Sequence, residues 1–195
     1  MDKHNLSALA RQALGQYDLN VTRLRLASRS TNAIYRVTDQ AGRAYALRLA
    51  TPGWRTLSDL QAEAAWLEAL ARETDVGAPA VMRTRADDAV VVLPGGVHAT
   101  LMEWLPGRLL GKQLTAANLR KMGALFAALH AHSATWQPPA GFSQRRFDRL
   151  FARGEPVALL DPPVVEACPP GGADIIRQAR ERVDAAYAAI NPADL

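Results

Sequence analysis

The sequence at residues 44–49 is AYALRL, and its alternation is typical of a β-strand with two different faces. Tyr45 and two leucines fall on one face, whereas Ala46 and Arg48 fall on the other. Such a face could receive a flat ring over Ala46 and a phosphate group at the permanently charged guanidinium of Arg48. The same pattern would also arise if Arg48 ended an edge strand and met only solvent.

A helix is expected over residues 58–72, and its apolar stripe contains one carboxylate. Glu63 falls in the same row as three leucines, so its side chain is aimed at the interior. An unpaired carboxylate is costly to bury, and Arg48 on the preceding strand is the natural cationic partner. In the alternative, Glu63 lies at the margin of the stripe and reaches water, while Ala64 supplies the buried position.

The rest of the chain predicts an α+β fold, with an antiparallel sheet plus helix first and mainly helices afterwards. A hairpin turn is expected at residues 39–42 and another turn at 94–96. The helix at 58–72 is expected to have Ser58 as its N-cap, with Gln61 completing a capping box. The expected strands are 21–27, 33–38, 44–50, 80–85, 88–93 and 98–105, and the other expected helices are 6–17, 116–132, 145–152 and 173–190.

The character of the sequence changes near Gly107, from strand signals to helix signals. We therefore expect two domains, residues 1–106 and residues 107–195. The helix at 116–132 has an apolar stripe, so it is expected to pack on something substantial. A Pro/Gly-rich stretch, residues 154–172, is expected to separate the last two helices.

Composition argues against several classes of protein. The net charge of +4 comes from arginines that are spread along the chain, which argues against a nucleic-acid partner. Cys168 is the only cysteine, so no internal disulfide framework is possible. No apolar run approaches the ~20 residues of a membrane span, and no signal peptide is visible. These features predict a soluble cytoplasmic protein with no membrane partner.

The ordered set of motifs resembles the aminoglycoside phosphotransferase and choline kinase family, including its homoserine-kinase-like members. The set consists of the strand ending in Arg48, the helix glutamate Glu63, a polar loop at 28–32, a segment at 101–107 that reads LMEWLPG, and a helical segment at 125–130. The resemblance implies a protein-kinase-like N-lobe followed by the first helices of a mainly helical C-lobe. It also implies ATP and a small-molecule acceptor as ligands.

What the resemblance implies for individual residues begins with the adenine ring. The ring would lie between Ala46 and the segment joining the lobes, hydrogen-bonded to the backbone around Glu103 and Leu105, with Met102 lining the rear. Arg48 would hold the α and β phosphates, where the family more often has lysine. Glu63 would orient Arg48, and the outer phosphates would meet Ser28, Ser30, Thr31 and Asn32.

The groups that perform phosphoryl transfer in kinase-like folds are not found in the sequence. None of the four histidines is followed two residues later by aspartate, and Asp75 belongs to a connection, where it is expected to form a turn. We therefore expect a truncated kinase that ends before its catalytic loop, with Mg in the full-length parent and no catalytic or metal-binding residue here. In the alternative, the chain is a non-catalytic, pseudokinase-like nucleotide-binding or regulatory module.

The histidine pair His130 and His132 is the remaining candidate for metal binding. Residues two apart on a helix point about 200° from each other, so the two rings cannot easily share a metal. One packed and one solvated histidine are expected instead.

Overall fold

The computed structural model describes residues 3–107, 110–144 and 158–189. The chain forms two compact units, Met1–Ser143 and Gln144–Leu195. These units are defined by how densely their residues contact one another, which does not test the expected domains. The two domains expected at residues 1–106 and 107–195 therefore stay a prediction.

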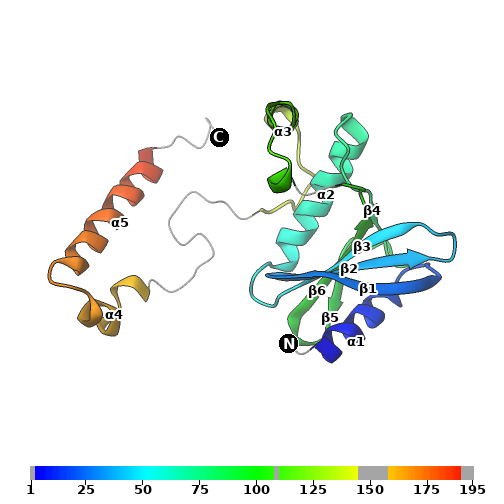
Figure 1. Ribbon diagram of the computed structural model, residues 1–195, viewed down its shortest axis with the longest axis horizontal. Helices are drawn as coiled ribbons and strands as arrows, with labels where there is room; N and C mark the ends of the chain where they lie inside the picture. Colours follow the sequence, from blue (N-terminus) through cyan, green and yellow to red (C-terminus); the bar gives the residue numbers. More distant parts are fainter. Residues whose placement is uncertain (1–2, 108–109, 145–157, 190–195) are drawn as a thin grey trace. The chain divides into compact units, whose positions relative to one another are not determined.

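An antiparallel six-stranded sheet is the centre of the first unit (Figure 1). Its order is β1-β2-β3-β6-β4, and β5 also pairs with β6. The predicted α+β class is therefore confirmed. The strands are β1 Val21–Arg29, β2 Asn32–Asp39, β3 Ala44–Ala50, β4 Val81–Met82, β5 Val91–Leu93 and β6 Val97–Glu103.

One face of the sheet packs on the first helix, α1 Lys3–Leu14 (Figure 1). The apolar residues of β3 expected on one face, including Tyr45 and Leu47, are buried in this core. The opening helix lies three residues earlier at each end than the predicted 6–17. Gly15 and Gln16 follow it in a turn that is closed by backbone hydrogen bonds to Arg11 and Ala13.

The two turns of the sheet lie where the sequence places them. At the β2–β3 turn, the carboxylate of Asp39 accepts hydrogen bonds from the backbone and side chain of Arg43 and from the Tyr45 hydroxyl. At the second turn, Pro94–Gly96 have 3₁₀ character with a kink at Gly95, whose φ of 72° is not helical and favours glycine. Strands β4 and β5 are shorter than predicted because the residues between them make local turn hydrogen bonds, such as Thr84 to Asp88.

The second helix, α2 Leu57–Glu73, lies over the other face of the sheet. Its predicted N-cap was wrong. Thr56 caps the helix by accepting from the Asp59 backbone N–H, while the Asp59 carboxylate accepts from the Thr56 backbone, which is a complete capping box. Ser58 instead donates to the carbonyl of Ser143. Sequence spacing alone is consistent with either capping box, Thr56 with Asp59 or Ser58 with Gln61. In each pair a hydroxyl is followed three residues later by an acceptor.

The third helix, α3 Ala116–Thr135, begins at the N-cap Thr115 and extends three residues past its predicted end. The expectation that it packs on something substantial was wrong for the residues that the structure describes. Leu119, Leu125 and Phe126 are 44%, 44% and 50% exposed. His132 is the buried residue of the described helix.

The second unit is described over residues 158–189. Its final helix, α5 Gly172–Ala189, is shifted by one residue from the predicted 173–190. The stretch expected to be a separator contains a short helix, α4 Pro162–Ala167, which has proline at its start. The predicted helix at 145–152 lies outside the described residues. None of the helices in the described ranges combines the length and apolar character needed to cross a bilayer.

Candidate functional site

Arg48 and Glu63 form the centre of the candidate site. The guanidinium NH1 of Arg48 lies 2.8 Å from Oε1 of Glu63, which confirms the ion pair predicted between the strand and the helix. The two side chains are 13% and 25% exposed, so the pair is shielded from water over most of its surface. A partly desolvated pair of this kind fixes the position of each partner more firmly than a surface pair does.

Two further residues hold this pair, and sequence analysis missed both. Thr100 on β6 accepts a 3.1 Å hydrogen bond from Nε of Arg48, and Arg55 lies 3.6 Å from Oε2 of Glu63. Thr100 is directly opposite Arg48 in the β3–β6 register. That register depends on which strands pair. The contact between Thr100 and Arg48 therefore could not be predicted from the sequence. Arg55 could have been found, because it is a positively charged residue only eight residues before Glu63.

The same face of the sheet carries the residues predicted to receive a ring. Ala46 pairs with Met102 across β3–β6 and with Arg36 across β2–β3, and all residues opposite one another share a face. Ala46 and Met102 are half-buried. The guanidinium of Arg36 lies 5.1 Å from the ring centroid of Trp104, which follows β6. The structure thus brings Ala46, Met102 and Arg48 to one surface.

The backbone after β6 has a specific pattern of free and occupied groups. The Glu103 N–H donates to the Ala80 carbonyl at 2.8 Å, and the Trp104 N–H donates to the Ala44 carbonyl at 3.1 Å. The Leu105 N–H has no hydrogen-bond acceptor among the described residues, and Leu105 is 44% exposed. Of the two predicted ring-binding positions, the amide of Leu105 is therefore the one free to donate.

The predicted phosphate loop lies at the β1–β2 connection. Ser28, one residue before the end of β1, pairs with Ile34, and the Ser30 N–H donates to the Asn32 carbonyl at 3.0 Å. Thr31 is held by a hydrogen bond from Thr51 to its carbonyl. The side-chain Oδ1 of Asn32 is buried and has no hydrogen-bond partner in the described structure. The β2–β3 register places Asn32 on the sheet face that carries Arg48.

The two histidines of α3 behave as predicted. His130 is exposed, whereas His132 is buried between Trp66, Glu73 and Trp136. Over the described ranges, no three histidine, cysteine, aspartate or glutamate residues gather into a cluster that could hold a metal ion.

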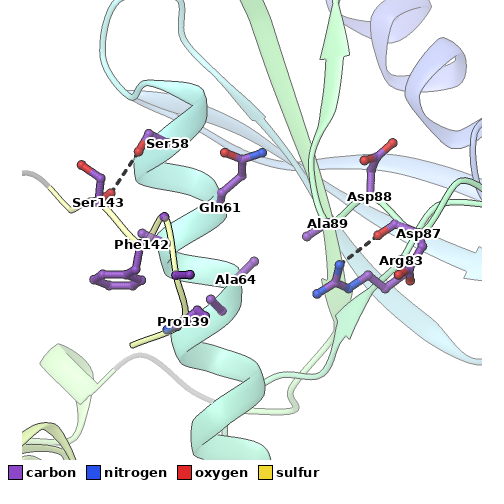
Figure 2. Close-up of a pocket in the computed structure, with 14 residues that line it drawn as sticks. Ser58, Gln61, Ala64, Arg83, Asp87, Asp88, Ala89, Pro139, Phe142 and Ser143 are labelled. Atoms are coloured by element: carbon purple, nitrogen blue, oxygen red, sulfur yellow. Dashed lines mark hydrogen bonds between the residues drawn. The ribbon is translucent and has the colours of Figure 1, made fainter. Parts of the chain in front are cut away.

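A pocket on another side of α2 contains none of the predicted site residues (Figure 2). The turn before β5 lines one part of it, and the segment Pro139–Ser143 lines another. Arg83 in its wall is already engaged, because it pairs with Glu68 and donates to the Asp87 carbonyl. The Arg83 contacts join the turn to α2, and the Ser58 hydroxyl joins the segment to α2 by donating to the Ser143 carbonyl (Figure 2).

Solved structures of small-molecule kinases resemble this chain. A microcompartment-associated aminopropanol kinase is 33% identical, with a TM-score of 0.62 over 72% of this chain and 45% of that one. Amicoumacin kinase hAmiN, solved with AMP-PNP, Ca2+ and Ami, is 16% identical, with a TM-score of 0.69 over 98% of this chain and 55% of that one. The chain therefore spans about half the length of each. No curated protein matches the sequence.

The sheet, its helices and these neighbours define a protein with a kinase-like fold. A family model, described as the phosphotransferase enzyme family, matches residues 22–190. The chain belongs to this family of kinase-like phosphotransferases, which confirms the resemblance that the ordered motifs indicated.

Proposed function

We propose that this chain is the nucleotide-binding part of an ATP-dependent kinase that acts on a hydroxyl group of a small molecule. The ion pair between Arg48 and Glu63, at 2.8 Å, is the observation that carries the proposal. It aligns a guanidinium on the sheet face that also presents Ala46 and Met102. A cation fixed in advance binds phosphate without the cost of ordering it during binding.

In this proposal each part of ATP has its own set of groups. The adenine lies over Ala46 with Met102 behind it, and the Leu105 N–H donates to a ring nitrogen, with a backbone carbonyl near Glu103 as the acceptor. The two known bonds of Arg48 use Nε and NH1, so its other terminal nitrogen is available to a phosphate oxygen. The outer phosphates would accept hydrogen bonds from donors of the polar loop, namely the hydroxyl groups of Ser28, Ser30 and Thr31 and the side-chain N–H of Asn32.

The acceptor and the metal are proposed for the parent protein. One structural neighbour is an aminopropanol kinase, and the other is an amicoumacin kinase that was solved with AMP-PNP and Ca2+. By analogy, we propose an alcohol on a small metabolite or antibiotic as the acceptor and Mg2+ as the cation that accompanies ATP. When bound, Mg2+ would neutralise charge on the phosphates. A cytoplasmic location is part of the proposal, because ATP is the ligand.

We expect no appreciable phosphoryl transfer by the 195-residue chain alone, since none of its histidines begins a His-x-Asp motif. Detection of ADP and a phosphorylated alcohol in equal amounts would contradict this expectation. The second candidate is a non-catalytic nucleotide-binding or regulatory module. The coding sequence distinguishes the two, because an open frame that continues into a His-x-Asp loop supports the kinase.

Titration with AMP-PNP, with and without Mg2+, tests nucleotide binding. Wild type should bind saturably, and Arg48→Ala should weaken binding by about 30-fold, which corresponds to the loss of ~2 kcal/mol from a charge-assisted contact. Arg120→Ala is the matched control, since Arg120 is an exposed arginine on α3, away from the sheet. Equal affinities for Arg48→Ala and wild type would contradict the proposal.

A further inference from the structure

We propose that His132 is a positioning residue for the proposed nucleotide site, because it ties α2 to α3 and thereby holds Glu63 in place against Arg48. The effect of His132 on nucleotide binding rests on the proposed function. The dependence of the Arg48–Glu63 pair on His132 does not require nucleotide binding, and it can be measured in the ligand-free protein.

The geometry around His132 joins two helices through both ring nitrogens. Nε1 of Trp66, on α2, lies 3.3 Å from Nδ1 of His132, and Oε2 of Glu73, at the end of α2, lies 3.0 Å from Nε2. The imidazole side chain is 6% exposed and stacks on Trp136 at a centroid distance of 6.0 Å. Phe142 meets the edge of the same Trp136 ring at 5.1 Å.

These contacts select one form of the imidazole. An indole N–H can only donate, so Nδ1 of His132 must accept from Trp66. Nε2 then carries the proton and donates to the Glu73 carboxylate. The neutral ring therefore uses both of its nitrogens, and both bonds go to α2. Glu73 also pairs with Arg72, which lowers the pKa of the Glu73 carboxyl group and helps to keep it ionised as an acceptor.

The link matters because of where it meets α2. Trp66 is three residues after Glu63, so the two side chains lie on neighbouring positions of one helix. The helix is anchored at its other end by Leu57 and Leu60, which pack near Ala50. His132 is the buried residue of α3 in the part of the chain that the structure describes, and α3 lies beside α2 (Figure 1). A rotation of α2 would move Glu63 and Trp66 together.

The first test uses the ligand-free 195-residue chain. The Nε–H resonance of Arg48, assigned by its disappearance in Arg48→Lys, reports the hydrogen-bonded guanidinium. We expect His132→Leu to broaden or shift this resonance, and His130→Leu to leave it unchanged, because His130 is the exposed histidine on the same helix. His132→Asn should restore it in part, since the amide oxygen can replace Nδ1 as the acceptor for Trp66.

The second test measures AMP-PNP affinity in the same variants. His132→Leu should weaken binding about tenfold, and it should have no further effect in a Glu63→Gln background, because it acts through Glu63. If His132→Leu fails to fold, Trp66→Phe removes the same hydrogen bond and must give the same losses. Failure of wild type to bind AMP-PNP would refute the proposed function, and the Arg48 resonance alone would then decide the present inference.

The inference is overturned if folded His132→Leu keeps the wild-type Arg48 resonance. It is also overturned if His132→Leu and Glu63→Gln weaken AMP-PNP binding additively, or if His130→Leu has the same effect as His132→Leu. A loss of thermal stability without a change in the Arg48 resonance indicates a purely structural histidine and likewise overturns it.

Discussion

Arg48 has three donor nitrogens to place, and the structure accounts for two of them. Nε binds Thr100 and NH1 binds Glu63, so the guanidinium is fixed from two directions. A lysine at this position would be a compact point charge and could not form this fork. The forked geometry explains why Thr100, a buried residue on a different strand, belongs to the candidate site.

Thr100→Val tests that assignment at the residue scale. Valine keeps the shape of threonine but removes the acceptor for Nε of Arg48. We expect AMP-PNP affinity to fall about fivefold, since a hydrogen bond of this kind contributes roughly 1 kcal/mol. In an Arg48→Ala background the same substitution should change the affinity little. An equal loss in both backgrounds would separate Thr100 from Arg48 and refute the assignment.

Sequence reasoning predicted the Arg48–Glu63 pair because both residues lie close in the chain and each needs the other's charge. It missed Thr100 because 52 residues separate it from Arg48, and only the pairing of β6 with β3 brings the two together. The role of Leu105 was predicted from resemblance. Which amide is free became visible only when the acceptors of Glu103 and Trp104 were known.

Among the secondary-structure elements, α2 carries Glu63, and its first turn fixes where that helix begins. Thr56→Ala should reduce the free energy of unfolding by about 1 kcal/mol, because it removes the side-chain half of the capping box. Ser58→Ala should cost less than about half of that, since Ser58 makes one exposed contact to Ser143. Urea unfolding of the two variants measures the difference. A larger loss for Ser58→Ala would restore the predicted N-cap.

The β2–β3 hairpin sets the register that places Arg48, and Asp39 holds its turn. Burial opposes ionisation of Asp39, but hydrogen bonds from Arg43 and Tyr45 outweigh it and lower the pKa of the carboxyl group. A pKa that is lower in the folded state gives stability above the ordinary value of about 4, and that stability is lost as the pH falls through the lowered value.

Asp39→Asn should therefore destabilise the protein at pH 7. The difference from wild type should shrink as the pH falls below about 4, where the unfolded chain takes up the proton first and the folded protein follows at its lowered pKa. Thermal unfolding between about pH 3 and pH 7 measures this, with the exposed Asp75→Asn as the control. A difference that stays constant over this pH range would show that the charge of Asp39 is not what stabilises the turn.

At the scale of the whole molecule, the first unit has a densely packed core between the sheet and α1, whereas the apolar residues of α3 are largely exposed. Leu47 is fully buried in the core between the sheet and α1, whereas Phe126 on α3 is 50% exposed. The alternating pattern of β3 predicted the core correctly. The apolar stripe of α3 predicted burial that the described residues do not provide, because periodicity shows which face is apolar but not whether a partner covers it.

The two positions should respond very differently to truncation. Leu47→Ala should reduce the free energy of unfolding by about 3 kcal/mol, because it leaves a cavity in a closed core. Phe126→Ala should change it by less than about 1 kcal/mol, since half of the ring already meets solvent. Denaturant unfolding of both variants measures this contrast. A large loss for Phe126→Ala would show that α3 is covered after all.

The most direct test of the central claim is to map AMP-PNP onto the chain by amide chemical-shift perturbation. If the nucleotide binds the Arg48 face of the sheet, the largest changes should fall on Ala46, Arg48, Met102 and Leu105 and on the loop at 28–32. In Arg48→Ala the same changes should need about 30 times more AMP-PNP. Perturbations confined to the pocket beside Pro139–Ser143 (Figure 2), or unchanged in Arg48→Ala, would contradict the account.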